Sequence, residues 1–320
     1  MSKPIPSKKR KPKPAHSAAY ARKLGGVASS AQPTVSIYWL IAAICIAIIG
    51  AVVFAWGTLC VLFWQGSWQL LYHPSSAVVR TPASVGLAFD SIGFATNAAG
   101  EPQLRGWWIP YSSESRYTFL YLHGADGNLG DTVQAFIPLR ATNQNIFTFD
   151  YRGYGMSRFK HPSEARWRED AESAIEYLTN TRHIPPGSIV LVGKELGANL
   201  ALEVAAAHPE LAGVVLEQPL EAPTTPIFND PRAHLVPAHM LVSDRWEPSA
   251  PAANLRLPSL WIYFTTTNKN SAQEDRPAIY QQVSARKSLL WLTDSADAQK
   301  NNSTALSRWI DDLKANPQSR

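Results

Sequence analysis

The sequence predicts an α/β domain, with a mostly parallel sheet covered by helices on both faces, that follows a single apolar helix. Two observations predict this architecture. Short apolar runs typical of buried strands alternate with helical patterns from residue 86 toward the C-terminus, which favours strand–helix–strand units and a parallel sheet. Ahead of that alternation, residues 37–64 form a nearly unbroken run of aliphatic and aromatic residues, longer than a bilayer core requires.

Charge is divided unevenly along the 320 residues. Residues 1–23 carry eight basic and no acidic side chains, whereas the remainder holds 22 basic and 25 acidic residues, a net charge of −3. The sequence pI of 9.1 therefore describes the tail rather than the domain. We interpret residues 1–34 as a disordered cytoplasmic tail that directs membrane topology and touches anionic lipid headgroups, and we expect no nucleic-acid partner.

The apolar run lies in a gap without charged residues between Lys23 and Arg80, and residues 35–66 are predicted to be a transmembrane anchor. Its length exceeds the ~20 residues that cross a bilayer core. A cleaved signal peptide would have a short basic start and an apolar region of ~7–15 residues, so we expect the anchor to stay uncleaved. Aromatic residues stand toward both ends of the run, as at membrane interfaces: Tyr38, Trp39, Trp56, Trp64 and Trp68.

The basic tail sets the orientation of this anchor. The positive-inside rule places the N-terminus in the cytoplasm and the C-terminal domain outside it, in the periplasm if the source is a Gram-negative bacterium. Both cysteines, Cys45 and Cys60, lie within the anchor, so the outward domain contains no disulfide. The predicted protein is a single-pass membrane protein.

Residues 67–320 are expected to form one domain. Two strands, 87–90 and 104–109, would form a hairpin around a turn at 97–100. Further strands are predicted at 117–122, 145–149, 188–192, 213–217, 260–264 and 288–292, and helices at about 130–141, 164–181, 198–208, 276–285 and 302–314. The Pro-rich segment 219–258 interrupts the alternation and is expected to cover the top of the sheet as a small cap.

One turn stands out between a predicted strand and a predicted helix. It reads Gly193-Lys194-Glu195-Leu196-Gly197. Serine hydrolases place G-x-S-x-G on such a turn, because glycines let the helix approach the strand closely and the serine is held exposed. Here Glu195 occupies the position of the serine.

Four further segments follow one another in a characteristic order. They are Leu71–Pro74 with Thr81-Pro82 and Gly86-Leu87; Gly106–Pro110; the loop His123-Gly124-Ala125-Asp126-Gly127-Asn128; and Phe149–Ser157, which reads F-D-Y-R-G-Y-G-M-S. Together they resemble the α/β-hydrolase fold, specifically the membrane-tethered Bem46-like hydrolases, over nearly all of residues 70–315. The resemblance implies that the backbone amides of Ala125 and Leu196 correspond to the oxyanion hole of that family.

The resemblance also implies where a catalytic triad would stand. The family order is nucleophile, acid and histidine, which falls on Glu195, near Asn268 and near Asp297. No histidine follows His239 anywhere in the chain. We therefore expect all three triad positions to be degenerate.

Several roles remain open for Glu195. A carboxylate nucleophile serves haloalkane dehalogenases and epoxide hydrolases of this fold, but these enzymes also need a histidine to activate water. Glu195 could instead act as a general base, since burial would raise its pKa. A third hypothesis is that its carboxylate turns into the oxyanion hole and accepts the hydrogen bonds of the Ala125 and Leu196 amides.

Other polar residues are expected to be structural. Asp150, Arg152 and Ser157 are interpreted as fixing the loop after a central strand, and the cap residues around Asp244 as packing on the core. No Cys/His cluster and no Walker-type loop occurs, so neither a metal nor a cofactor is expected.

The sequence thus favours a pseudoenzyme: a membrane-anchored α/β-hydrolase-like protein without catalysis that binds a membrane-protein partner or a small-molecule ligand. The alternative is a hydrolase of ester, thioester or amide substrates with an altered mechanism that uses Glu195.

Overall fold

The computed structural model describes residues 35–111, 115–265, 276–293 and 298–315. The chain divides into two units between Ala55 and Trp56. Two of the predicted site positions, Asn268 and Asp297, lie outside the described residues.

The first long element is helix α1 (Ile37–Gly66). Its 30 residues are apolar on every side, and nearly all of their side chains are exposed. By length and composition it is the one helix in the described part of the chain that could cross a membrane. The apolar helix is therefore confirmed, and its passage through a membrane remains a prediction. A short 3-10 helix, η1 (Ser67–Leu70), follows it.

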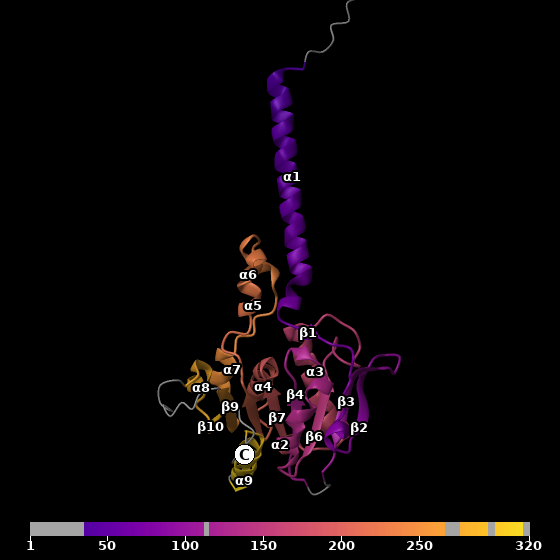
Figure 1. The fold of residues 1–320 in the computed structure, drawn as a ribbon, viewed down its shortest axis with the longest axis vertical. Coiled ribbons are helices and arrows are strands. Elements are labelled where there is room, and N and C mark those ends of the chain that lie inside the picture. The colour runs from indigo at the N-terminus through magenta and orange to yellow at the C-terminus, as the bar shows by residue number, and fades with distance from the viewer. Residues whose placement is uncertain (1–34, 112–114, 266–275, 294–297, 316–320) are drawn as a thin grey trace, which may run out of the picture. The chain divides into compact units, whose positions relative to one another are not determined.

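The domain is built on an eight-stranded sheet with the order β10-β9-β8-β7-β4-β6-β3-β2 (Figure 1). Neighbouring strands from β10 to β6 run parallel, whereas β3 lies antiparallel to both β6 and β2. This confirms the mostly parallel sheet. The strands are β2 (Asp90–Thr96), β3 (Pro102–Ile109), β4 (Thr118–Leu122), β6 (Asn145–Asp150), β7 (Ile189–Lys194), β8 (Gly213–Glu217), β9 (Ser259–Thr265) and β10 (Lys287–Thr293).

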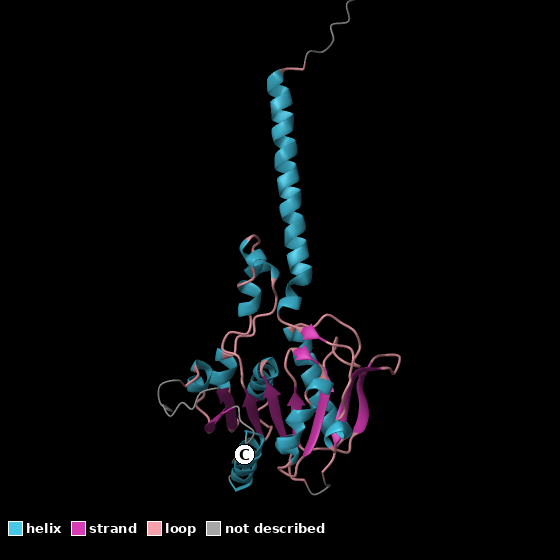
Figure 2. Ribbon diagram, in the orientation of Figure 1, coloured by secondary structure: helices cyan, strands magenta, loops and turns pink. Residues whose placement is uncertain are grey.

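Helices cover both faces of this sheet (Figure 2). The first core contains buried side chains from α3 (Glu164–Glu176) and α4 (Leu196–Ala207). The second contains those of α2 (Phe136–Arg140) and α9 (Ala298–Ala315). Successive side chains of a strand point to opposite faces, and Trp107 and Trp108 of β3 accordingly enter different cores.

Two predicted elements differ from the structure. The first strand of the hairpin is β2 at Asp90–Thr96, rather than 87–90. Its side chains are mostly exposed or half-buried, so it lacks the apolar run by which a buried strand is recognised. The helix expected at 130–141 is broken into η3 (Leu129–Asp131), η4 (Val133–Ala135) and α2, because a capping box at Asn128 starts a tight first turn.

Shorter elements complete the described fold. β1 (His73–Pro74) pairs in parallel with β5 (Asp126–Gly127). The remaining helices outside the cap are η2 (Pro82–Val85), the π-helical η5 (Tyr177–Thr181), η6 (Pro186–Ser188) and α8 (Ala278–Gln282).

The predicted cap lies between β8 and β9. It consists of α5 (Thr225–Phe228), η7 (Pro231–His234), α6 (Ala238–Leu241) and α7 (Ser249–Asn254). α5 and α6 project from the domain beyond the ends of the strands (Figure 1). The buried Tyr72 hydroxyl bonds to Asp244 at 2.5 Å and accepts from Trp246 Nε1 at 2.9 Å, which ties the cap to the core as expected.

Candidate functional site

The turn between β7 and α4 has the strained geometry that its glycine pattern predicts. Glu195 has φ 54° and ψ −121°, a conformation that a residue with a side chain rarely adopts. Its amide donates to the Glu217 carbonyl at 2.8 Å, and its carbonyl accepts from Ala198 N at 2.9 Å at the start of α4. Contacts on both sides therefore hold the turn in place.

The two glycines of the turn leave no room for a side chain. A Cβ on Gly193 would lie 2.2 Å from the Gly197 carbonyl oxygen, and a Cβ on Gly197 would lie 2.2 Å from the His123 carbonyl oxygen. Both neighbours are backbone atoms, which cannot rotate away. The elbow-like close approach of helix and strand is thus present, whatever residue stands at its apex.

Gly197→Ala is expected to lower the free energy of unfolding by about 3 kcal/mol. The added methyl group must displace the backbone at the end of β4 and in the loop that follows it. Urea titration of the detergent-solubilised chain measures this loss. Gly66→Ala is the matched control, since a Cβ there meets nothing within 4 Å, and its effect should stay within about 0.5 kcal/mol. Equal stability of the two variants would contradict the steric argument.

The Glu195 carboxylate turns toward Lys194 and Gly124. Its Oε1 lies 3.6 Å from Lys194 Nζ, with the two side chains 41% and 43% exposed, and its Oε2 lies 3.0 Å from the Cβ position of Gly124. An ion pair this exposed is screened by water and contributes little stability. Its main consequence is to set where the carboxylate lies.

The hypothesis of a plugged oxyanion hole is not supported. The Glu195 side chain makes no capping hydrogen bond to the first turn of α4. Among the described residues, neither the Ala125 nor the Leu196 amide donates to its carboxylate. The loop 123–125 does lie against the turn, as the close contacts of Gly124 and Gly197 require. The assignment of the two amides to an oxyanion hole therefore stays a prediction.

The segments that would carry the acid and the histidine leave from the same edge of the sheet. β9 and β10 run parallel to β8, which in turn runs parallel to β7, so all four strands end at that edge. Asn268 follows β9 and Asp297 follows β10, outside the described residues. The topology is thus compatible with the expected positions, which stay predictions.

Sequence reasoning missed a buried carboxylate beside the turn. Glu217 ends β8, is the register partner of Lys194, and is almost completely buried. Asn302 of α9 donates a hydrogen bond to it at 3.4 Å. Burial raises the pKa of Glu217, while the hydrogen bond from Asn302 and the charge of Lys194 oppose that rise. In the sequence, a single charged residue at the end of the apolar run Gly213–Leu216 could have indicated this buried carboxylate.

His123 belongs to the loop that lies against the turn, and its ring is directed into the core. Its ring lies among Tyr151, Tyr154 and Trp167, and its Nδ1 is 2.7 Å from the Gly124 carbonyl oxygen. Burial lowers its pKa to about 4, so the ring is neutral at pH 7. Its 3.8 Å contact with Asp150 is therefore not an ion pair at that pH.

Three other described histidines have partners away from the turn. His73 pairs with Asp126, His208 with Glu172 and Glu210, and the ring of His239 stacks on Phe228. In the described ranges, no histidine forms a hydrogen bond or ion pair with Glu195. The same part of the chain contains no group of three or more His, Cys, Asp or Glu side chains that could hold a metal ion.

Hydrogen bonds fix the loop after β6, as predicted. Ser157 Oγ donates to the Asp150 carbonyl at 2.5 Å and accepts from Arg105 N at 2.9 Å. The Asp150 carboxylate accepts from Leu129 N at 2.9 Å. Arg152 bonds to Asp170 on α3. These contacts join the loop to β3, to α3 and to the segment after β5.

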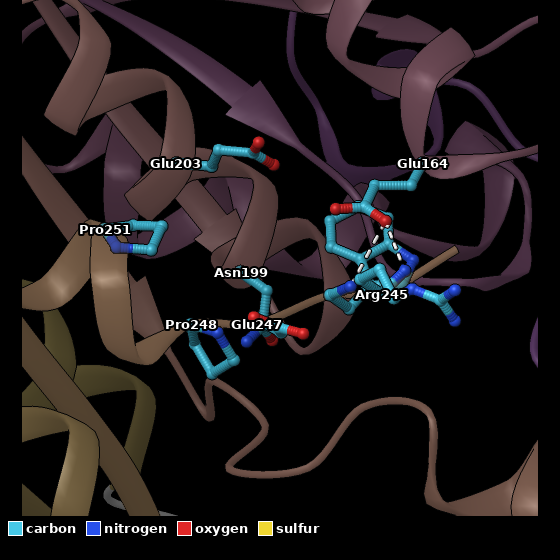
Figure 3. A pocket seen from close by; sticks show the side chains of 8 residues that line it. Glu164, Asn199, Glu203, Arg245, Glu247, Pro248 and Pro251 are labelled. Carbon is cyan, nitrogen blue, oxygen red and sulfur yellow. Dashed lines mark hydrogen bonds between the residues drawn. The ribbon is translucent and has the colours of Figure 1, made fainter. Parts of the chain in front are cut away.

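A cavity of about 260 Å³ lies between the cap and α4 (Figure 3). The Glu164 carboxylate accepts from the backbone amides of Arg245 and Trp246, which closes one side. Asn199, one turn along α4 from Glu195, reaches its wall, but Glu195 is not a lining residue. The full lining is Glu164, Asn199, Glu203, Arg245, Trp246, Glu247, Pro248 and Pro251.

Curated relatives match part of this chain. The α/β hydrolase domain-containing protein 17C of Homo sapiens is 33% identical over 140 residues, which are 43% of this chain and 42% of that protein. The uncharacterized protein YfhR of Salmonella typhimurium is 34% identical over 136 residues, 41% of this chain and 44% of that protein. The matches thus span less than half the length of these relatives.

A solved structure shares the fold. The esterase Pf2001 of Pyrococcus furiosus has a TM-score of 0.55 at 16% identity, over 76% of this chain and 98% of that one. The sequence model described as serine aminopeptidase, S33 matches residues 113–304, more than half of the chain. The protein therefore belongs to the serine aminopeptidase S33 family of the α/β-hydrolase superfamily.

Proposed function

We propose that this protein is a membrane-anchored, non-catalytic member of its family that acts by binding at the membrane. One observation carries the proposal: Glu195 stands at the apex of the strained turn where the chemistry of a serine hydrolase needs a hydroxyl. The absence of any histidine after His239 in the sequence supports it, since the family order places the histidine last. A closer grouping with the Bem46-like hydrolases stays a prediction.

The surroundings of Glu195 support loss of catalysis. A carboxylate nucleophile forms an ester that water must then attack, and a histidine is needed to take the proton of that water. His123 is fully buried among aromatic rings, and none of the other described histidines forms a hydrogen bond or ion pair with Glu195. Lys194 lies beside the carboxylate instead, and a lysine ammonium cannot serve as that base while it is protonated.

Binding would take place at the membrane surface. Residues 35–66 would hold the chain in the bilayer, with the basic tail in the cytoplasm and the domain outside it, in the periplasm of a Gram-negative bacterium. The domain would then recognise a membrane-protein partner or a small-molecule ligand. The cavity beside the cap is a place for such a ligand, because carboxylates and an arginine line it.

The second candidate function is catalytic: the protein would hydrolyse an ester, thioester or amide through Glu195. What favours it is the retained turn, in which Gly193 and Gly197 still allow close approach and Glu195 still adopts the strained backbone conformation. A turn of this kind presents its central side chain to a substrate.

Activity measurements separate the two functions. We expect the purified full chain in detergent to turn over none of a panel of short-chain esters and to react with no fluorophosphonate probe. Glu195→Ser is expected to restore neither, because no histidine would reach the introduced hydroxyl. Turnover in Glu195→Ser would show that a histidine does reach the turn.

Ester turnover by the wild type that is lost in Glu195→Gln would instead establish the second function. The exposed residue Glu101, in the hairpin far from the turn in sequence, supplies the matched control. Glu101→Gln makes the same change of charge and should leave any such turnover unaltered.

A further inference from the structure

The cap carries a projecting tip that is hydrogen-bonded to the C-terminal part of α1. We define this cap tip as residues 231–241, which comprise η7 and α6. Trp56 Nε1 donates a hydrogen bond to the Leu235 carbonyl at 3.0 Å. α5, which precedes the tip, contacts η1 directly after α1. The tip therefore lies at the level of Trp56.

The position of Trp56 along α1 sets the depth of the cap tip. Residues 37–56 are 20 residues of uninterrupted apolar helix, and ~20 such residues cross the ~30 Å hydrocarbon core. If the core begins near Ile37, Trp56 stands at its outer boundary, where tryptophan is favoured. If the core begins further along the helix, Trp56 lies deeper. Leu235 is therefore at the boundary or within the membrane in either case.

The surface of the cap tip suits that boundary. Leu235 is 61% exposed and Met240 is 85% exposed, although both are large hydrophobic side chains. On α1 beyond Trp56, Val61, Leu62 and Trp64 are also exposed. Large exposed apolar side chains such as these are stabilised by contact with an apolar medium rather than water.

The cap tip carries basic and no acidic side chains, which suits contact with anionic lipid headgroups. Residues 231–243 contain no acidic residue, and Arg232, His234 and His239 are exposed. Asp230, directly before the tip, is paired with Arg232. Apolar side chains beside basic ones are the pattern of segments that lie in the headgroup region of anionic bilayers.

From these observations we infer that the cap tip inserts into the outer leaflet of the membrane, so that the protein contacts the bilayer at a second place besides α1. The inference rests on the anchoring part of the proposed function. The occupant of the exposed surface at Leu235 and Met240 is then lipid. A domain held at two places is fixed in orientation, and the carboxyl ends of its strands face the membrane.

The test uses the full chain in vesicles of phosphatidylcholine and phosphatidylglycerol, three parts to one. In a background with Cys45→Ala and Cys60→Ala, a single cysteine carries an environment-sensitive fluorophore in Leu235→Cys or Met240→Cys. Two control positions are labelled in the same way. Val53→Cys on α1 is the reference for a side chain in the membrane, and Ala98→Cys in the exposed turn of the β2–β3 hairpin is the reference for a side chain in water. Because all four side chains are exposed in the structure, labelling should leave the fold intact.

Quenching by aqueous iodide and by lipids spin-labelled near the headgroup is then compared. We expect the labels at Leu235 and Met240 to be quenched by the lipid and to be several-fold less sensitive to iodide than the label at Ala98. The label at Val53 should be protected from iodide in the same experiment.

Two outcomes would overturn the inference in different ways. Iodide sensitivity at Leu235 and Met240 equal to that at Ala98, with Val53 protected, would remove cap insertion and leave the anchor. Iodide sensitivity at Val53 would overturn the anchor itself, and with it the premise of an inserted cap.

Discussion

Trp167→Ala is expected to lower the free energy of unfolding by about 3–5 kcal/mol, the largest effect of any single substitution considered for this protein. The indole is completely buried on α3, and its removal leaves a cavity that rigid neighbours cannot fill. It stacks on Tyr151 with ring centroids 4.0 Å apart and contacts four further rings: Tyr72, His123, Tyr154 and Trp246. Urea titration of the detergent-solubilised chain gives the measurement.

Those rings come from separate parts of the chain: the segment after α1, the loops after β4 and β6, and the cap. Trp167→Ala should therefore loosen the cap as well as the core. Trp291→Ala is the matched control, because that indole is 41% exposed and its ring contacts Tyr263. A loss of about 1 kcal/mol is expected there. Similar losses for the two variants would contradict the central role of Trp167.

Asp150→Asn is expected to change how stability depends on pH. Burial raises the pKa of Asp150 to about 7 from an ordinary 3.8, and the amide of Leu129 only partly opposes this. The native state therefore holds the proton more tightly than the unfolded state. The resulting stabilisation is complete below pH 3.8 and is lost as the pH rises to about 7.

Asparagine keeps an acceptor for the Leu129 amide but has no charge to bury. Relative to the wild type, the free energy of unfolding of Asp150→Asn should thus rise by up to roughly 4 kcal/mol between pH 4 and pH 7. His123 acts in the opposite direction, since burial lowers its pKa to about 4 and its contribution is lost as the pH falls. It is present in both proteins, so the difference between them reports on Asp150.

Urea titrations at several pH values measure this difference. The exposed Asp90 provides the matched control, and Asp90→Asn should show a constant difference from the wild type across the same range. A constant difference for Asp150→Asn as well would contradict the burial of an ionisable carboxyl group in this loop.

The turn at Glu195 keeps its shape independently of the side chain at its apex. The backbone there is held by contacts of Gly193 and Gly197 and by the hydrogen bond from Glu195 N to the Glu217 carbonyl. None of these contacts involves the side chain at the apex. Substitution of the side chain at that position should therefore cost little stability, whereas substitution of either glycine should damage the fold.

Local sequence patterns are sufficient to predict most of the secondary-structure elements of this protein and their order. The uncharged apolar run predicts α1, and the alternation of apolar runs with helical patterns predicts the order of most strands and helices. The glycine spacing predicts the turn at 193–197, and the sequence alone shows that no histidine follows His239. These features depend on residues that are close together along the chain, so periodicity and turn chemistry are sufficient to find them.

Only the tertiary structure decided which side chains meet. Asn302 bonds to Glu217 across 85 positions of sequence, and Trp56 bonds to Leu235 across 179. The path of the chain, and not any local pattern, brings such pairs together. The same holds for the direction of the Glu195 carboxylate, which the sequence left open between three roles and which Lys194 and Gly124 define in the folded protein. Backbone form follows from local propensity and burial pattern, whereas side-chain partners depend on how distant elements pack.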